Sequence, residues 1–248
     1  MIYNSVYSKF QKYKTPSKDF LSYLKDLLHL EDDTMALEVL QAAGFWFSQK
    51  GGMLELETLH RDIKSSTFCF VDIETTGAKP LESQVIEIGA IKYRDGEILE
   101  EFQTLVHAHF VPESITELTG IDVEMLESAP KEERCLQDFR EFLGDSVFVA
   151  HNVAFDYGFI SARLELYGSV GLLNPRLCTV ELARKSILSL KYSLAYLNEF
   201  LGINIADSHR AYFDALACLR VFEIACLSLS EGVVSVQDLI EFSRGKRI

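Results

Sequence analysis

The chain has 248 residues, of which 48% are hydrophobic and 25% are charged, a composition typical of a globular protein with a full apolar core. Its net charge of −13 argues against a protein that binds long duplex nucleic acid by neutralising phosphates. It still allows an enzyme that holds a few nucleotides through metal ions, since the ions supply positive charge. The sequence has neither a run of about 18 apolar residues nor a signal-peptide pattern, so we expect a cytoplasmic protein with no membrane partner.

The first quarter of the chain, residues 1–64, is predicted to form a small separate unit. Apolar residues in 17–30 and 32–45 recur at helical spacing, and 45–58 indicates two strands around a pair of glycines. Two helices followed by a hairpin resemble a winged-helix unit. Such a unit could dock a partner or contact nucleic acid, or it could be a packing appendage, since it is near neutral and has no basic stripe. Residues 60–66 are predicted to be a linker.

The pattern then changes to strands, at 66–73, 84–94 and 98–108. Asp95-Gly96 between the second and third is a tight hairpin signal, so the three predict an antiparallel meander. Strands followed by helices and shorter strands predict an α/β layered domain over 65–230, with a C-terminal helix in 231–248. The later helices are expected at 113–119, 122–127, 130–143, 155–168, 193–202, 209–229 and 235–244, and a strand at 146–150.

The first strand ends in two acids one residue apart, in the stretch FCFVDIETTG. Alternate residues of a strand point to the same face, so Asp72 and Glu74 should project together. Two close carboxylates repel unless something neutralises them, and hard oxygen ligands suit magnesium or manganese. A strand end that reaches solvent is the alternative, because acids there are harmless.

Two later stretches contribute further polar groups. In VFVAHNVAFDYGFI, an apolar strand is followed by His151 and Asn152, and Asp156 falls in the first turn of a helix, where an acid also favours the helix dipole. In HRAYFDALACLRVF, His209 stands at a helix start and Asp214 lies five residues on. A histidine there suits a proton acceptor, although each of these residues alone could be ordinary surface polarity.

Taken in order, these three pieces resemble the motifs of the DEDDh (DnaQ-like) family of 3′–5′ exonucleases, and particularly its bacterial DNA polymerase III epsilon (proofreading) type. The pieces are DxE at Asp72, HNxxFD at His151 and HxxxxD at His209. The stretches VIEIGAI, ITELTGIDVEML and LKYSLAYLNEFLGI continue the likeness, which covers roughly 66–228. It implies a ribonuclease H-like fold, in which a mixed sheet is flanked by helices.

The resemblance implies hydrolysis of a phosphodiester at a 3′ end with two Mg²⁺ or Mn²⁺ ions, which releases a nucleoside 5′-monophosphate. Two cations about 4 Å apart bind the attacking water and the leaving oxygen together. By resemblance, Asp72 bridges both metals, Glu74 and Asp214 hold the metal that activates water, and Asp156 completes the other position. His209 takes the proton from the water.

The resemblance also implies contacts with the terminal nucleotide. Gly77 would let backbone approach the ligand, and Phe155 would be available for stacking, although a plain turn would equally explain the residues just after Glu74. The full set of implied substrate-binding residues is Thr75, Thr76, Gly77, Leu118, Thr119, Asn152 and Phe155.

Three functions remain open at this stage. The first is an exonuclease that proofreads or trims single-stranded or frayed DNA 3′ ends, with the DNA polymerase III catalytic subunit or a sliding clamp as candidate partner. The second is an RNA-trimming enzyme, since both substrates present the same 3′ phosphodiester. The third is a non-catalytic interaction protein with the same fold. The stretch QDLIEF at 237–242 resembles a clamp-binding peptide but also fits a plain amphipathic helix.

Overall fold

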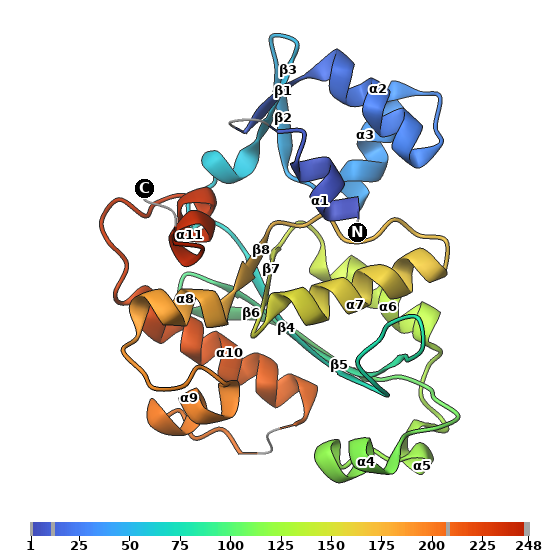
Figure 1. The fold of residues 1–248 in the computed structure, drawn as a ribbon, viewed down its shortest axis with the longest axis vertical. Helices are drawn as coiled ribbons and strands as arrows, with labels where there is room; N and C mark the ends of the chain where they lie inside the picture. Colours follow the sequence, from blue (N-terminus) through green and yellow to red (C-terminus); the bar gives the residue numbers. More distant parts are fainter. Residues whose placement is uncertain (1, 11–12, 207–208, 246–248) are drawn as a thin grey trace.

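The computed structural model describes residues 2–10, 13–206 and 209–245. Met1 and 246–248, at the ends of the expected first and last units, lie outside this part of the chain. In the described residues, a five-stranded mixed sheet lies at the centre of the larger lobe, and a smaller lobe sits above it (Figure 1). The five strands are β4 (Phe68–Thr75), β5 (Val85–Arg94), β6 (Glu97–Leu105), β7 (Val147–Ala150) and β8 (Arg176–Cys178).

The strand order is β6-β5-β4-β7-β8. The predicted meander is confirmed, because β4 pairs antiparallel with β5 and β5 with β6. On its other edge β4 pairs parallel with β7, and β7 pairs parallel with β8. The strand β4 therefore lies in the middle of the sheet with both faces covered, which explains its continuous apolar run.

Helices cover both faces of the sheet, so the mixed α/β prediction is confirmed (Figure 1). Alternate residues of β4 face opposite sides of the sheet. Val71 packs in the same apolar cluster as Phe139 and Tyr157 on one side, and Phe70 packs in the cluster of Phe222 on the other. The helices of the larger lobe are α4 (Glu113–Thr119), α5 (Val123–Leu126), α6 (Glu132–Leu143), α7 (Val153–Leu166), α8 (Thr179–Ser186), α9 (Leu194–Phe200), α10 (Ala211–Cys226) and α11 (Val236–Ser243).

Two elements of the larger lobe were absent from the sequence expectations, β8 and α8. The strand has three residues and the helix has eight, so neither spans enough of the sequence to show a clear period. No helix within the described ranges is long and apolar enough to cross a bilayer.

The N-terminal lobe contains the two predicted helices and the predicted hairpin. It also contains α1 and β1, which the sequence analysis did not predict, and β1 extends the hairpin to a sheet of order β1-β3-β2. Its elements are α1 (Ile2–Tyr7), β1 (Lys14–Pro16), α2 (Ser17–Leu28), α3 (Asp33–Ala42), β2 (Phe47–Lys50), β3 (Met53–Leu56) and the 3-10 turn η1 (Glu57–Leu59).

The two lobes share one apolar core. The ring of Tyr3 in α1 meets Tyr157 in α7 edge to face, with centroids 5.3 Å apart. The backbone N–H of Leu173 donates to the carbonyl of Ala43 at 2.7 Å. The segment 60–66, expected as a linker, is tied down at Asp62, which bridges to Ser235. The division of the chain into separate units near residues 64 and 230 therefore stays a prediction.

Gly44 is the tightest point of this junction. It has φ +85°, and a Cβ there would lie 2.2 Å from the side-chain oxygen of Asn174. Asn174 is buried and donates to the carbonyls of Gly144 and Ser146. A side chain at position 44 would therefore disturb both lobes.

We expect Gly44→Ala to destabilise the protein by both backbone strain, about 1–2 kcal/mol, and overpacking, about 1–3 kcal/mol. Gly52→Ala is the matched control, because Gly52 also has positive φ but a Cβ there meets nothing within 4 Å. Denaturant unfolding of both variants gives the difference. Equal losses of stability would show that the contact with Asn174 contributes nothing.

Candidate active site

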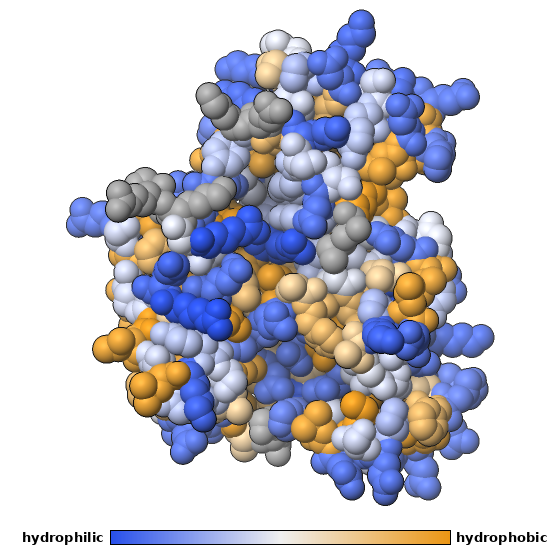
Figure 2. Space-filling model, in the orientation of Figure 1, coloured by the Kyte–Doolittle hydropathy of each residue, from blue (hydrophilic) through white to orange (hydrophobic). Residues whose placement is uncertain are grey.

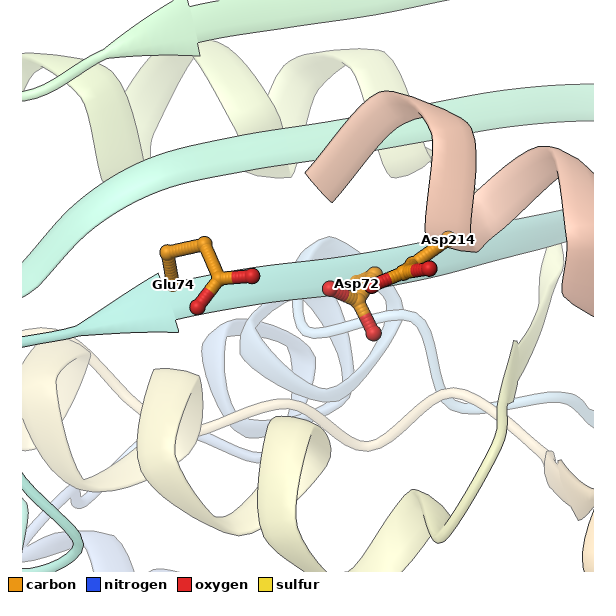
Figure 3. Close-up of side chains that lie close together, drawn as sticks. All are labelled: Asp72, Glu74 and Asp214. Atoms are coloured by element: carbon orange, nitrogen blue, oxygen red, sulfur yellow. The ribbon is translucent and has the colours of Figure 1, made fainter. Parts of the chain in front are cut away.

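Three carboxylates from two elements converge at the end of β4 that carries the predicted acids (Figure 3). Asp72 and Glu74 come from β4, on the face covered by α10, and Asp214 comes from the first turn of α10. One ligand oxygen from each lies within 4.8 Å of the others. The strand's period of two places the first pair together, and the packing of α10 on the sheet brings the third residue.

Asp156 approaches the same place from α7, on the other side of the sheet. It is only 4% exposed, and burial raises its pKa to about 7, opposed by hydrogen bonds with its own backbone and that of Ile73. After burial, its charge is the largest influence that raises the pKa of Asp72. All four predicted acids thus act on one another, although Asp156 is not part of the three-residue group.

The electrostatics of the site oppose full ionisation. Burial, followed by the neighbouring carboxylates, raises the pKa of Asp72 well above its usual range and that of Glu74 to about 8. Burial also raises the pKa of Asp214. A divalent cation binds clustered carboxylate oxygens and neutralises the repulsion between their charges. The acidic cluster therefore fits a bound metal ion.

His209 lies at the start of α10 with an exposed side chain. Its backbone has φ +68°, which is uncommon for a residue other than glycine, and its N–H donates to Oδ2 of Asp214 at 3.1 Å. Interaction with His209 lowers the pKa of Asp214, against the effect of burial. The predicted proton acceptor is thus held beside one predicted metal ligand.

His151 has a different environment. Its ring nitrogens lie 2.9 Å from Oγ1 of Thr179 and 2.8 Å from the carbonyl oxygen of Tyr192, and burial lowers its pKa. Both nitrogens are engaged, so His151 fixes the segments that follow β7 and β8.

Glu87 of β5 is a residue whose role the sequence analysis missed. It is fully buried and forms an ion pair with Arg210, whose Nη2 donates at 2.7 Å, and it accepts the backbone N–H of Ala211 at 3.0 Å. Two residues along, a Cβ on Gly89 would lie 2.2 Å from the backbone nitrogen of Tyr212. The strand β5 therefore holds the start of α10 in place through the polar contacts of Glu87 and through the close backbone contact at Gly89. The only sequence signal was an acid inside an apolar strand.

The residues after Glu74 form a turn held by their own side chains. Thr75 donates from Oγ1 to the carbonyl of Gly77 at 2.9 Å, and Oγ1 of Thr76 accepts the N–H of Gln84 at 3.1 Å. These hydrogen bonds are those of an ordinary turn, which was the alternative interpretation of these residues. The turn directly follows Glu74 and so lies next to the acids. Their contact with a nucleotide stays a prediction.

The remaining predicted substrate residues are divided between two places. Leu118 is 51% exposed at the end of α4, whereas Thr119 is buried, and its hydroxyl donates to the carbonyl of Ile115. Asn152 precedes α7 with φ +84°, and its carbonyl accepts the N–H of Phe155 at 2.9 Å. Phe155 thus lies on the same helix as Asp156, and Asn152 directly precedes that helix.

The chain matches a family model described as exonuclease (RNase_T) over residues 69–222. It is 39% identical over 163 residues to the DNA polymerase III subunit epsilon of Aquifex aeolicus, a match that covers 65% of this chain and 81% of that one. It is 40% identical over 174 residues to a DNA polymerase III PolC-type of Clostridium perfringens, covering 69% of this chain and 12% of that one. The chain therefore spans about one eighth of the length of the PolC-type relatives.

Solved structures show the same fold. Exonuclease I superposes with a TM-score of 0.60 at 16% identity, over 66% of this chain and 41% of that one. Exonuclease X in complex with 5′ overhanging duplex DNA superposes with a TM-score of 0.54 at 21% identity, over 71% of this chain and 99% of that one. The predicted ribonuclease H-like fold is confirmed. The chain belongs to the exonuclease family, and the acidic cluster lies within the matched residues.

We expect the metal-free protein to lose stability as pH rises from about 4 to about 8. Glu74 and Asp156 bind protons more tightly folded than unfolded, because their pKa values rise from 4.5 to about 8 and from 3.8 to about 7. Stability must fall wherever the folded state holds more protons. Denaturant unfolding with a chelator measures this.

Asp72→Asn removes one charge from the cluster. The metal-free variant should therefore be more stable than the wild type near pH 8, and its stability should depend less on pH. Added Mg²⁺ should stabilise the wild type more at higher pH, because metal competes with protons for the carboxylates. A metal-free stability that rises with pH would contradict this account of the site.

Gly89→Ala should lower exonuclease kcat/KM by about 100-fold, since a misplacement of about 1 Å has effects of that size. Its Cβ must displace the backbone that begins α10, and with it Asp214 and His209. Gly232→Ala is the control, because a Cβ there meets nothing within 4 Å. An active Gly89→Ala enzyme would show that the start of α10 tolerates displacement.

Proposed function

We propose that this protein is a metal-dependent 3′–5′ exonuclease that hydrolyses phosphodiesters at DNA 3′ ends, releases nucleoside 5′-monophosphates, and proofreads in replication or repair. The observation that carries the proposal is the convergence of Asp72, Glu74 and Asp214, with the backbone N–H of His209 bonded to the third acid. Membership of the exonuclease family and the similarity to a polymerase epsilon subunit support it.

We assign two Mg²⁺ or Mn²⁺ ions to the acids. Asp72 lies between the others and would contact both ions, Glu74 and Asp214 would hold one, and Asp156 would hold the second. When bound, the ions offset the charge of the phosphodiester and lower the pKa of the attacking water. Raised carboxyl pKa values favour this assignment, because cations remove the repulsion that raises them.

His209 is assigned as the proton acceptor. A neutral imidazole nitrogen can accept a proton, and the exposed ring can pass the proton on to solvent. The Glu87–Arg210 ion pair and the bond from His209 to Asp214 hold its backbone in the left-handed conformation. The backbone of His209 is thus held beside Asp214.

The terminal nucleotide is assigned to the space between the turn 75–77 and α7. A cavity of about 460 Å³ lies beside this turn and is lined by Pro80, Leu81, Phe155 and Phe159 among others. The exposed Leu81 and the ring of Phe155 offer apolar surface for a base. A strand end must be unpaired to enter, which favours frayed or mismatched ends.

A polymerase is the proposed partner, because the similar proteins are a DNA polymerase III subunit and a PolC-type polymerase. The clamp alternative gains no support from α11. In the segment QDLIEF, Leu239 and Ile240 are buried in the core, and Gln237 accepts a hydrogen bond from Thr58 at 2.7 Å. The segment behaves as a plain amphipathic helix.

The test is digestion of 3′-mismatched, 3′-matched and single-stranded DNA beside single-stranded RNA, with Mg²⁺ or Mn²⁺. We expect 5′-mononucleotides, fastest from mismatched and single-stranded DNA. Asp72→Ala should be inactive but folded, because it removes a ligand common to both ions. Faster digestion of RNA would overturn the DNA assignment, and no digestion of any substrate would overturn the enzymatic one.

A further inference from the structure

A polar groove lies beside the first turn of α7, where the larger lobe meets α1. Its cavity has a volume of about 450 Å³, and its lining comes from both lobes. We call it the interlobe groove. It is lined mainly by Tyr3, Tyr7, Val153, Ala154, Arg176 and Arg244.

The groove lies beside the first turn of α7, the helix that carries Asp156. Val153 and Asp156 are three residues apart on α7, so they lie on the same side of the helix, about 5 Å apart along its axis. Ala154 lines both this groove and the cavity of Phe155. A strand that leaves the acidic site along α7 therefore reaches the groove within one or two nucleotides.

The groove is locally basic in an acidic chain. Its charged lining residues are Arg176, Arg244 and Glu181, so two cations and one carboxylate line it in a chain with a net charge of −13. Arg184 and Lys185 follow Glu181 by three and four residues, so they extend the groove along α8. Both are exposed, and neither forms an ion pair with any residue that the structure describes.

Figure 2 shows the hydropathy of one face of the molecule. Its most hydrophilic side chains gather over α8 and between α11 and the N-terminal lobe, around a hollow at the junction of the lobes. Lys185 reaches the backbone after α11, because a Cβ on Gly245 would lie 2.8 Å from its Nζ. The cations of α8 and Arg244, which follows α11, thus lie on one surface.

The N-terminal helix orients the arginines of this surface. The guanidinium of Arg176 lies 4.1 Å from the ring centroid of Tyr3, and its Nη2 lies 3.4 Å from Oδ1 of Asn4. Arg244 hydrogen-bonds the hydroxyl of Tyr3 and so opposes the rise in its pKa. Tyr3 is itself buried, so it holds cations in place and leaves no face for a base.

We propose that the interlobe groove binds the phosphodiester backbone of single-stranded nucleic acid on the 5′ side of the terminal nucleotide, and that the N-terminal lobe serves to complete it. This rests on the proposed exonuclease function. Planar guanidinium groups suit phosphate oxygens, and a polyanion needs local cations to approach a protein of this net charge. Such contacts carry no sequence preference.

The test compares the full-length wild type with Arg184→Glu/Lys185→Glu in binding oligothymidylates of increasing length, with Ca²⁺ in place of Mg²⁺. Fluorescence anisotropy at several salt concentrations gives the affinity and its salt slope. For the long strands, the double variant should bind at least tenfold more weakly. Its slope should be smaller by about 1.4, because each lost phosphate contact contributes about 0.7 for single strands.

A substrate too short to reach the groove separates binding from chemistry. Hydrolysis of the p-nitrophenyl ester of thymidine 5′-monophosphate should be unchanged in the double variant, whereas KM for the long strand should rise. Lys18→Glu/Lys50→Glu is the matched control, because both lysines are exposed in the N-terminal lobe outside the groove and the change in net charge is the same. The control should bind long strands as the wild type does.

The proposal is wrong if the double variant binds long strands with the affinity and salt slope of the wild type. It is also wrong if the control variant loses as much affinity, because net charge alone would then explain the effect. Arg244→Glu, on a different element, should shift affinity in the same direction. An equal loss on oligouridylate supports the groove as a backbone site, since DNA and RNA share the phosphates. If the wild type fails to hydrolyse the ester, the exonuclease function fails, and the anisotropy result still decides the groove.

Discussion

The repulsion among the carboxylates at the end of β4 is the constraint on which the site depends. Asp72, Glu74 and Asp214 would move apart if their elements were free, because burial and mutual charge penalise ionisation. Two features hold them in place. The central position of β4 fixes the first pair, and Glu87 with Gly89 fixes the start of α10. The fold thus maintains an arrangement whose repulsion is relieved by bound cations or by protonation.

The same constraint explains why Glu87 is buried with its charge. A buried carboxylate without a partner is strongly destabilising, and Glu87 has both Arg210 and the backbone of Ala211. Arg210 lowers the pKa of Glu74, but the carboxylate of Glu87 raises it more. The ion pair therefore locates the start of α10 and offsets the negative charge near the site only in part.

The N-terminal lobe is joined to the larger lobe through packing rather than through a linker alone. Tyr3 meets Tyr157, and Gly44 meets Asn174, which in turn bonds the turn before β7. This lobe closes one side of the basic groove beside α7. An acidic chain can bring a polyanion to an acidic site if cations line the approach and metal ions fill the centre. The first condition depends on how the lobes meet, whereas the acids of the second all come from the larger lobe.

The sequence determined the meander, most helices, and the four acids and two histidines of the motifs. These features can be recognised locally, because the periods of strands and helices are visible within a few residues. The spacing of the motifs can likewise be read without knowing how the chain packs. It did not determine β8 and α8, which are too short to show a period, nor α1, whose contacts are with distant residues. It left His151 without a role and assigned His209 as the proton acceptor by resemblance. Only the tertiary structure decided that one is buried between Thr179 and Tyr192 and the other is exposed beside Asp214, because burial and partners depend on elements that are distant in the chain.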